Sequence, residues 1–192
     1  VNLSDDSTDD ETARLVETCY PKVNYRHNKK PYGHIFNWNV AIRMAKGEYI
    51  KVMFSDDWFT DSTSLGAYVA LLDENPDVLL AFSGSRQVML DGQDISAMHH
   101  VTTAHQKNFY DRSAEDGFIE RLGSDYRNLF LGNQIGAPSA VIYRRGSELT
   151  LFDEQSNWAS DMFLYFDLFE KCPAFAFTHK PLVSIGVHEK QY

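Results

Sequence analysis

The feature that most constrains the fold is an alternating segment, rich in β-branched and aromatic residues, that runs into two adjacent carboxylates. The pattern of residues 48–54 predicts a β-strand, and Asp56 and Asp57 follow it after one serine. A second acidic turn, which includes Asp5, follows the apolar start of the chain. In open α/β sheets, ligands bind outside the carboxyl ends of the strands. Two strands that both end in aspartates therefore predict one site with several carboxylates.

A site of several carboxylates repels an anionic ligand unless a hard divalent cation lies between them. Each candidate residue also has a simpler interpretation. An Asp-Asp pair is usually a solvated turn, Asp5 and its neighbours fit a helix cap, and Asp161 fits an N-cap. His188 taken alone fits a surface histidine. Because both acidic turns follow predicted strands, their combination favours a functional site over two solvated turns.

Hydrophobic periodicity predicts strands that alternate with helices. Thr8 and Glu11 fit a capping box for a helix over about residues 9–18, with Leu15 and Val16 on its inner side. The other predicted elements are strands at 23–25, 48–54, 78–83, 86–90, 139–143 and 181–187, and helices at 35–45, from 61 onwards, 116–122 and 161–170. This order is typical of an α/β fold with a parallel sheet covered on both faces.

Composition excludes several classes of protein. The chain has 192 residues and 43% hydrophobic residues, which predicts one globular domain. A net charge of -9 argues against a nucleic-acid partner or an anionic-membrane patch. No apolar stretch approaches the length of a transmembrane helix. The two cysteines, Cys19 and Cys172, are predicted to be reduced thiols, which fits a cytoplasmic chain.

The motifs in their order resemble those of the GT-A fold glycosyltransferases of family 2. The segments that carry the resemblance are Asp5-Asp6-Ser7-Thr8-Asp9, Asn39, Ala45-Lys46-Gly47-Glu48-Tyr49-Ile50, Ser55-Asp56-Asp57, residues 136–145, Phe152-Asp153-Glu154, Ser160-Asp161, Pro181-Leu182-Val183 and His188. The resemblance implies a three-layer α/β/α fold with a mainly parallel central sheet. It also implies a single domain over residues 1–192, with a nucleotide-binding half at about 1–90 and an acceptor-binding half at about 91–192.

The resemblance assigns a role to each candidate residue. Asp5 matches the carboxylate that binds the nucleobase, and Asp56 matches the first residue of the DXD-type pair, which holds the ribose. Asp57 matches the ligand of the divalent metal, and His188 matches a histidine that touches the metal or the diphosphate. Asp161 matches the general base that deprotonates the acceptor.

The implied protein is a metal-dependent inverting glycosyltransferase with Mn²⁺ or Mg²⁺ as its cofactor. It would move a sugar from a nucleotide-diphospho-sugar, with a UDP-sugar as the expected donor, to a hydroxyl group of a glycan or lipid-linked acceptor. That activity belongs to the synthesis of glycans or cell-surface polysaccharides. The expected location is cytoplasmic, at most peripheral at the inner membrane face, with no transmembrane segment.

The sequence departs from the family pattern at several positions. Ser4 and Asp6 stand where the family has Asp and Gly or Asn, Phe54 replaces an acidic residue, and Ser160 replaces a frequent Glu. These changes leave the principal carboxylates in place but blur donor specificity. The family also opens with a strand and helix before the position of Val1. We therefore expect a domain that is incomplete at its N-terminus, and poorly stable as an isolated chain.

Two alternatives remain open at this stage. The first is a metal-dependent nucleotidyl- or phosphotransferase on a related sheet, which would need a basic phosphate cradle after the first strand. No GxxxxGK[ST] loop is present in the sequence. The second is a non-catalytic module that binds a nucleotide-sugar. Binding of UDP with and without Mn²⁺, followed by a donor-hydrolysis assay, distinguishes all three.

Overall fold

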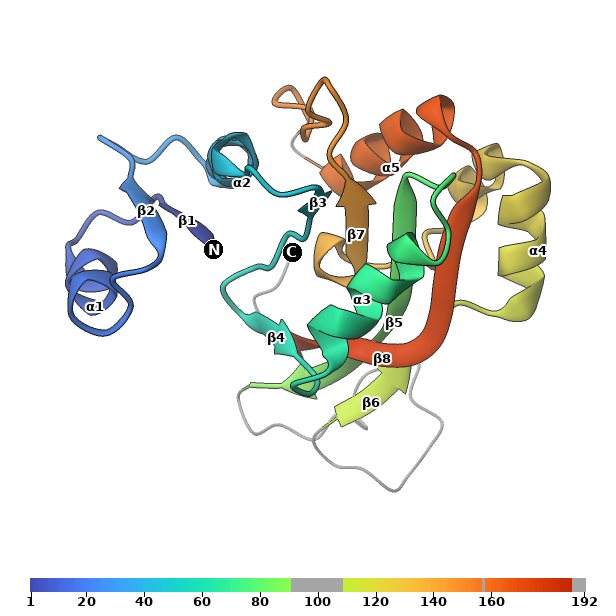
Figure 1. The fold of residues 1–192 in the computed structure, drawn as a ribbon, viewed down its shortest axis with the longest axis horizontal. Helices are drawn as coiled ribbons and strands as arrows, with labels where there is room; N and C mark the ends of the chain where they lie inside the picture. The colour runs from blue at the N-terminus through green and yellow to red at the C-terminus, as the bar shows by residue number, and fades with distance from the viewer. Residues whose placement is uncertain (91–108, 157, 188–192) are drawn as a thin grey trace. The chain divides into compact units, whose positions relative to one another are not determined.

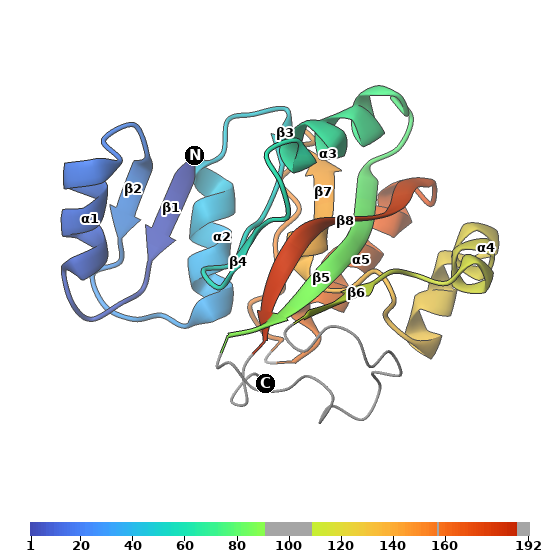
Figure 2. The same cartoon turned by 90° about the horizontal axis from the view of Figure 1, so that it is seen from below.

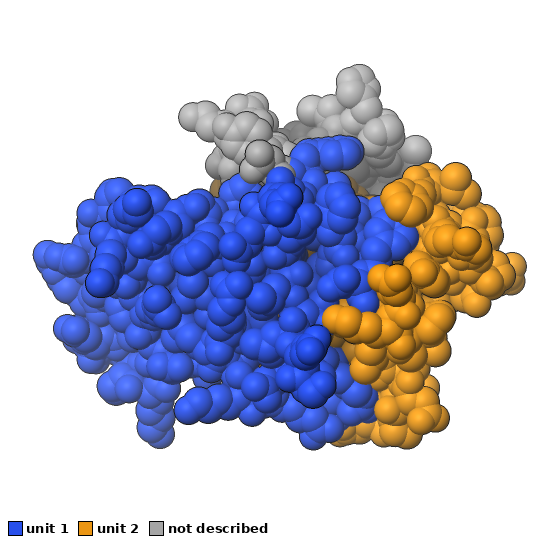
Figure 3. Space-filling model, turned by 90° about the horizontal axis from the view of Figure 1, so that it is seen from above, with its two compact units in different colours: residues 1–50, 144–167 blue, residues 51–143, 168–192 orange. Residues whose placement is uncertain are grey.

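The computed structural model describes residues 1–90, 109–156 and 158–187. The chain divides into two compact units, which Figure 3 colours separately. Unit 1 comprises Val1–Ile50 and Arg144–Asp167, and unit 2 comprises Lys51–Tyr143 and Leu168–Tyr192. These units are defined by packing, so the functional halves at about residues 1–90 and 91–192 stay a prediction.

Unit 1 is built on a β-α-β segment followed by a second helix. Its elements are β1 (Asn2–Asp5), α1 (Glu11–Cys19), β2 (Asn24–His27), α2 (His34–Met44) and β3 (Tyr49–Ile50). Strands β1 and β2 pair in parallel, with Asp5 opposite His27. Figure 2 shows α1 beside β2 and α2 beside β1. The crossover helix lets two parallel strands lie side by side, as the alternation in the sequence predicts.

Helix α1 does not begin with the predicted capping box. The helix starts at Glu11, and the side chain of Asp9, not that of Thr8, accepts a hydrogen bond from the Glu11 backbone N–H at 2.9 Å. Val16 is buried as predicted, whereas 54% of Leu15 is exposed. The side-chain hydrogen bond at the start of α1 therefore comes from Asp9, one residue later than the pattern indicates.

Unit 2 contains a mixed sheet. Its strands are β4 (Asp57–Phe59), β5 (Leu80–Met89), β6 (Phe109–Arg112), β7 (Val141–Arg144) and β8 (Phe175–Val187). The long strands β5 and β8 run parallel and side by side (Figure 1). Strands β6 and β7 pair with β5, and β4 with β8, all antiparallel. The predicted α/β class is confirmed, but the sheet of unit 2 is not mainly parallel, because its shorter strands return antiparallel to the central pair.

The sheet of unit 2 has helical cover on both faces. The remaining elements are α3 (Ser64–Asp73), α4 (Asp116–Ser124), the 3₁₀ helices η2 (Tyr126–Leu131) and η3 (Pro138–Ala140), and α5 (Ser160–Lys171), which ends in unit 2. Ser83 of β5 bonds Tyr68 of α3, and the neighbouring Phe82 packs against Phe175, which contacts Phe169 of α5. Because successive strand residues point to opposite faces, α3 and α5 cover different faces.

Several predicted strand boundaries are wrong, among them the start of the strand predicted at 181–187, since β8 begins at Phe175. The strand predicted at residues 48–54 ends at Ile50, and residues 51–54 are not in a strand. The strands predicted at 78–83 and 86–90 are one continuous strand, β5, with an irregularity around Gly84. A Cβ at Gly84 would lie 2.4 Å from the backbone oxygen of His179, so the close approach of β8 requires glycine.

In the described ranges, no helix is long and apolar enough to cross a membrane.

Candidate active site

The Asp56–Asp57 turn lies in unit 2, where β4 begins. The backbone N–H of Gly186, in β8, donates to the backbone oxygen of Asp56 at 3.1 Å and approaches a carboxylate oxygen of Asp57 at 3.3 Å. The Ser139 hydroxyl, in η3, also bonds the Asp57 carboxylate. A Cβ at Gly186 would lie 2.5 Å from the Asp56 backbone oxygen, so glycine allows β8 to hold the turn this closely.

Electrostatics disfavour the ionised form of Asp57. Burial raises the pKa of the Asp57 carboxyl, and the adjacent Asp56 charge raises it further. Ser139, Gly186 and the more distant charge of Lys51 lower this pKa, but the net direction is upward. A divalent cation would reverse this balance, and carboxylate oxygens are the ligands that Mg²⁺ and Mn²⁺ prefer. The turn therefore fits a hard cation, although the described residues include no cluster of three or more His, Cys, Asp or Glu side chains of metal-binding geometry.

A lysine lies at the base of the same turn. The Lys51 ammonium donates to the backbone oxygen of Ser139, and to that of Val52 at 3.2 Å. It lies 4.5 Å from the ring centroid of Tyr68 and 5.8 Å from that of Phe59. Burial lowers the pKa of the Lys51 ammonium to about 7, against an opposing contribution from Asp57. The sequence predicts nothing for Lys51, because Ser139 and Tyr68 are distant from it along the chain.

Asp5 lies at the carboxyl end of β1 in unit 1, where its carboxylate is held in the ionised form. It accepts hydrogen bonds from the Tyr25 hydroxyl at 2.6 Å and from the Ser7 backbone N–H at 2.9 Å. Burial raises the pKa of Asp5, but these hydrogen bonds and the charge of His27 outweigh it, so the pKa lies below the ordinary value. An anchored, ionised carboxylate is suited to accept the N–H of a nucleobase.

Asp6 organises the loop that leads into α2. Its two carboxylate oxygens accept backbone N–H groups from Tyr32 and Gly33 at 2.8–3.1 Å and the side-chain amide of Asn28 at 2.9 Å. Gly33 is the residue just before the helix and has a φ of 96°, which glycine adopts without strain. The departure at Asp6 therefore has a structural use: the carboxylate binds N–H groups at the start of α2.

Asn39 joins α2 to the segment that precedes Asp161. The side chain is fully buried and exchanges two hydrogen bonds with the backbone of Phe152, both at 2.9 Å. It also donates to Glu154, which pairs with Arg43 at 3.1 Å. Asn39 is part of the family resemblance. Its side-chain amide satisfies both backbone hydrogen-bonding groups of Phe152, which lies 113 residues further along the chain.

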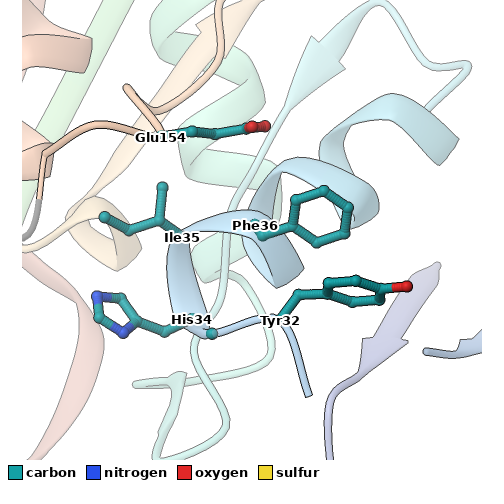
Figure 4. Close-up of a pocket in the computed structure, with 6 residues that line it drawn as sticks. Tyr32, His34, Ile35, Phe36 and Glu154 are labelled. Carbon is teal, nitrogen blue, oxygen red and sulfur yellow. The ribbon is translucent and has the colours of Figure 1, made fainter. Parts of the chain in front are cut away.

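A pocket of about 230 Å³ opens in unit 1 beside the start of α2. Figure 4 shows its lining: Tyr32, Gly33, His34, Ile35, Phe36 and Glu154. The rings of Tyr32 and Phe36 lie 4.7 Å apart between centroids. One carboxylate oxygen of Glu154 is used by Asn39 and Arg43. The pocket thus presents aromatic side chains beside a carboxylate that is held by hydrogen bonds.

The segment around Asp161 is strained and exposes an aromatic side chain. Asp161 lies in the first turn of α5. Ala159, just before the helix, has a φ of 55°, and no other non-glycine residue of the described ranges has a positive φ. Such strain is common at functional sites. Trp158 is 87% exposed and its backbone oxygen accepts a hydrogen bond from the Ser156 hydroxyl at 2.6 Å.

The predicted site residues fall into both units. Asp56 and Asp57 are adjacent in unit 2, whereas Asp5 and Asp161 belong to unit 1. His188 lies outside the described residues, directly after the end of β8 at Val187. The roles assigned to these five residues stay predictions.

Comparison with known proteins places the chain in a family. The model of glycosyl transferase family 2 matches residues 1–148. The chain therefore belongs to glycosyl transferase family 2, which confirms the predicted family and enzyme class. The crystal structures of S. aureus TarS 1-349 and of S. aureus TarS match 97% of this chain with a TM-score of 0.63 and 18% sequence identity. They support the GT-A fold.

Curated relatives are longer than this chain. The uncharacterized proteins Mb1547 of Mycobacterium bovis and Rv1520 of Mycobacterium tuberculosis are each 29% identical to it over 97 residues, or 48% of the chain. That region is 28% of the length of each relative. The chain likewise covers 50% of TarS 1-349 and 31% of the longer TarS chain.

Proposed function

We propose that the protein is a metal-dependent inverting glycosyltransferase that takes its sugar from a nucleotide-diphospho-sugar, with UDP as the nucleotide. The observation that carries this proposal is the Asp56–Asp57 turn, held by Gly186 and Ser139 in a chain that belongs to glycosyl transferase family 2. The ionised form of Asp57 is disfavoured there without a cation. The cofactor proposed is Mn²⁺ or Mg²⁺.

Each carboxylate has a separate task in this proposal. Asp5, kept ionised by Tyr25, would accept the N–H of uracil. Asp56 would bind the ribose, and Asp57, with His188, would hold the metal. When bound, the metal would neutralise charge on the leaving diphosphate.

Asp161 is proposed as the general base. It would take the proton of the acceptor hydroxyl while that oxygen forms its bond to the anomeric carbon. The bond from the anomeric carbon to the diphosphate breaks on the opposite side, which inverts the configuration and releases the nucleoside diphosphate. General-base catalysis of this kind contributes about 10²–10⁴ in rate.

The proposed acceptor is a glycan or a lipid-linked sugar. Trp158 supports it, because an aromatic ring that is 87% exposed three residues before Asp161 offers a flat apolar surface to a sugar ring. The pocket lined by Tyr32, Phe36 and Glu154 supports it as well, since it presents aromatic rings beside a carboxylate. Both features belong to unit 1, as does Asp161.

The experiment that tests the proposal follows donor consumption and product configuration. UDP-, GDP- and dTDP-sugars are incubated with the protein in Mn²⁺ or EDTA, and the products are identified by NMR. The proposal expects an α-linked UDP-sugar to give a free or transferred sugar of β configuration, with Mn²⁺ only. Retention of configuration would contradict inversion, and cleavage within the diphosphate would indicate a nucleotidyl- or phosphotransferase. Binding of UDP without consumption of any donor would indicate a non-catalytic module.

A further inference from the structure

The most unusual charged group in unit 2 is the ammonium of Lys51. It is enclosed by two backbone oxygens, from Ser139 and Val52, and by the face of the Tyr68 ring. The ammonium has three N–H donors, and the two backbone oxygens accept hydrogen bonds from it, while the Tyr68 ring centroid lies 4.5 Å away. Tyr68 is itself fully buried and bonded to Ser83 at 2.6 Å. The position of the cation is therefore fixed from several sides.

The surroundings of Lys51 connect it to the acidic turn. Ser139 accepts the ammonium through its backbone oxygen, while its hydroxyl bonds Asp57 and accepts the backbone N–H of Phe54 at 3.2 Å. The charge of Lys51 lowers the pKa of the Asp57 carboxyl, and the charge of Asp57 raises the pKa of the Lys51 ammonium. One residue of η3 thus links the lysine to the carboxylate that is the proposed metal ligand.

We propose that Lys51 is a built-in counter-charge for the Asp56–Asp57 turn, a positioning residue that weakens the turn's affinity for a free divalent cation and strengthens its affinity for an anionic nucleotide. The inference rests on the proposed function, in which this turn receives both the metal and the diphosphate. A cation linked through Ser139 to the carboxylate of Asp57 lowers the negative potential that a metal ion would experience there. The same cation makes the approach of a diphosphate less unfavourable.

A purely structural lysine predicts a different pattern. If Lys51 only stabilised the conformation of the turn, its loss would displace the carboxylates of Asp56 and Asp57. The binding of metal and of nucleotide would then weaken together. A counter-charge predicts effects of opposite sign on the two ligands. Substitution by glutamine isolates the charge, because the glutamine amide keeps an N–H donor for the Ser139 backbone oxygen.

The experiment measures two affinities separately by calorimetry at about pH 6, where Lys51 is protonated: Mn²⁺ alone, and UDP in EDTA. The variants are Lys51→Gln, the second neutral variant Lys51→Met, and Lys51→Arg, which keeps the charge. Lys180→Met is the matched control, because Lys180 is an exposed lysine of the same unit that lies 3.7 Å from Asp61. Circular dichroism melts establish that each variant is folded.

The inference expects Lys51→Gln to bind Mn²⁺ about three- to tenfold more tightly and UDP about three- to tenfold more weakly, the scale of a partly screened unit charge. Lys51→Arg and Lys180→Met should resemble the parent. If both affinities fall together, or neither changes in either neutral variant, the counter-charge role is wrong while the proposed function stands. A parent protein that binds neither Mn²⁺ nor UDP would overturn the proposed function and this inference with it.

Discussion

The Lys51 ammonium lies 4.5 Å from the ring centroid of Tyr68, and the Tyr68 hydroxyl lies 2.6 Å from the Ser83 hydroxyl. The Tyr68 side chain thereby contacts the Lys51 ammonium through its ring and β5 through its hydroxyl. Burying a charge is unfavourable unless the charge is paired and hydrogen-bonded. Here burial lowers the pKa of Lys51 to about 7 from an ordinary value of 10.5. The protonated form of Lys51 is therefore less favourable in the folded protein than in the unfolded chain.

The first prediction concerns the pH dependence of stability. The unfolded chain keeps the Lys51 proton up to about pH 10.5, whereas the folded chain releases it near pH 7. Between these values the unfolded state binds more protons, so this group makes the folded state more stable as the pH rises. Thermal melts of the parent and of Lys51→Met from about pH 6 to pH 10 should show the parent gaining stability relative to the variant. Parallel curves would show that Lys51 keeps its ordinary pKa.

The second prediction concerns Asp57 without metal. Its pKa is raised in the folded state, so the stability contributed by this group falls as the pH rises from 3.8 through the raised value. Asp57→Asn carries no such penalty and keeps an oxygen for the N–H of Gly186. In EDTA at neutral pH, its melting temperature should exceed that of the parent by about 2–4 °C, which corresponds to about 1 kcal/mol in a chain of this size.

Added Mn²⁺ should reverse that order. A ligand that binds only the folded state raises its stability, and the parent should gain from Mn²⁺ while Asp57→Asn does not. Asp77→Asn serves as the control, since Asp77 is an exposed residue of the same unit. A variant that is less stable than the parent in EDTA, or that responds equally to Mn²⁺, would contradict the electrostatic account of Asp57.

The third prediction concerns the hydroxyl of Tyr25. It donates to Asp5 at 2.6 Å and helps to hold the pKa of Asp5 below its ordinary value of 3.8. Tyr25→Phe should raise that pKa, as measured by NMR titration of the Asp5 carboxyl carbon. The parent keeps the stability from this ionised carboxylate at neutral pH and loses it as the pH falls through the lowered pKa. UDP binding should weaken by about one hydrogen bond's contribution, three- to tenfold. An unchanged Asp5 pKa would show that Tyr25 does not tune it.

The fourth prediction separates chemistry from binding at Asp161. Asp161→Asn keeps the shape of the side chain but removes its basicity. Sugar transfer should fall by about two or more orders of magnitude, while UDP affinity stays within about twofold of the parent. Asp153→Asn, in the same unit, is the control, because Asp153 is exposed and its carboxylate accepts the backbone N–H of Gln155. An equal loss of turnover and donor binding would make Asp161 a structural residue.

Much of the fold follows from local patterns in the sequence. Helices α2, α3, α4 and α5 lie within a few residues of their predicted positions, because their apolar spacing matches their burial. Residues 51–54 were predicted as a strand from the same kind of pattern, but the backbone N–H of Phe54 bonds the Ser139 hydroxyl and not a neighbouring strand. Strand β4 was not predicted, since it has three residues and begins at the carboxylate Asp57.

The carboxylates of the candidate site could be predicted from the sequence, whereas the residues that hold them could not. Asp5, Asp56 and Asp57 follow predicted strands, and this shared position, together with their residue type, indicates a site. The loop partner of Asp6 lies more than twenty residues away, and the Ser139 partner of Lys51 lies 88 residues away. Such contacts depend on tertiary structure, so no local pattern indicates them.

The most direct test of the central claim is calorimetry of UDP binding with and without Mn²⁺, on the parent and on Asp57→Ala, with Asp77→Ala as the control. If the Asp56–Asp57 turn holds the metal that binds the nucleotide, Mn²⁺ should strengthen UDP binding by the parent and the control at least tenfold, about 1.4 kcal/mol. Asp57→Ala should lose that enhancement while its circular dichroism spectrum stays unchanged. A folded Asp57→Ala variant with the parent's full response to Mn²⁺ would contradict the account.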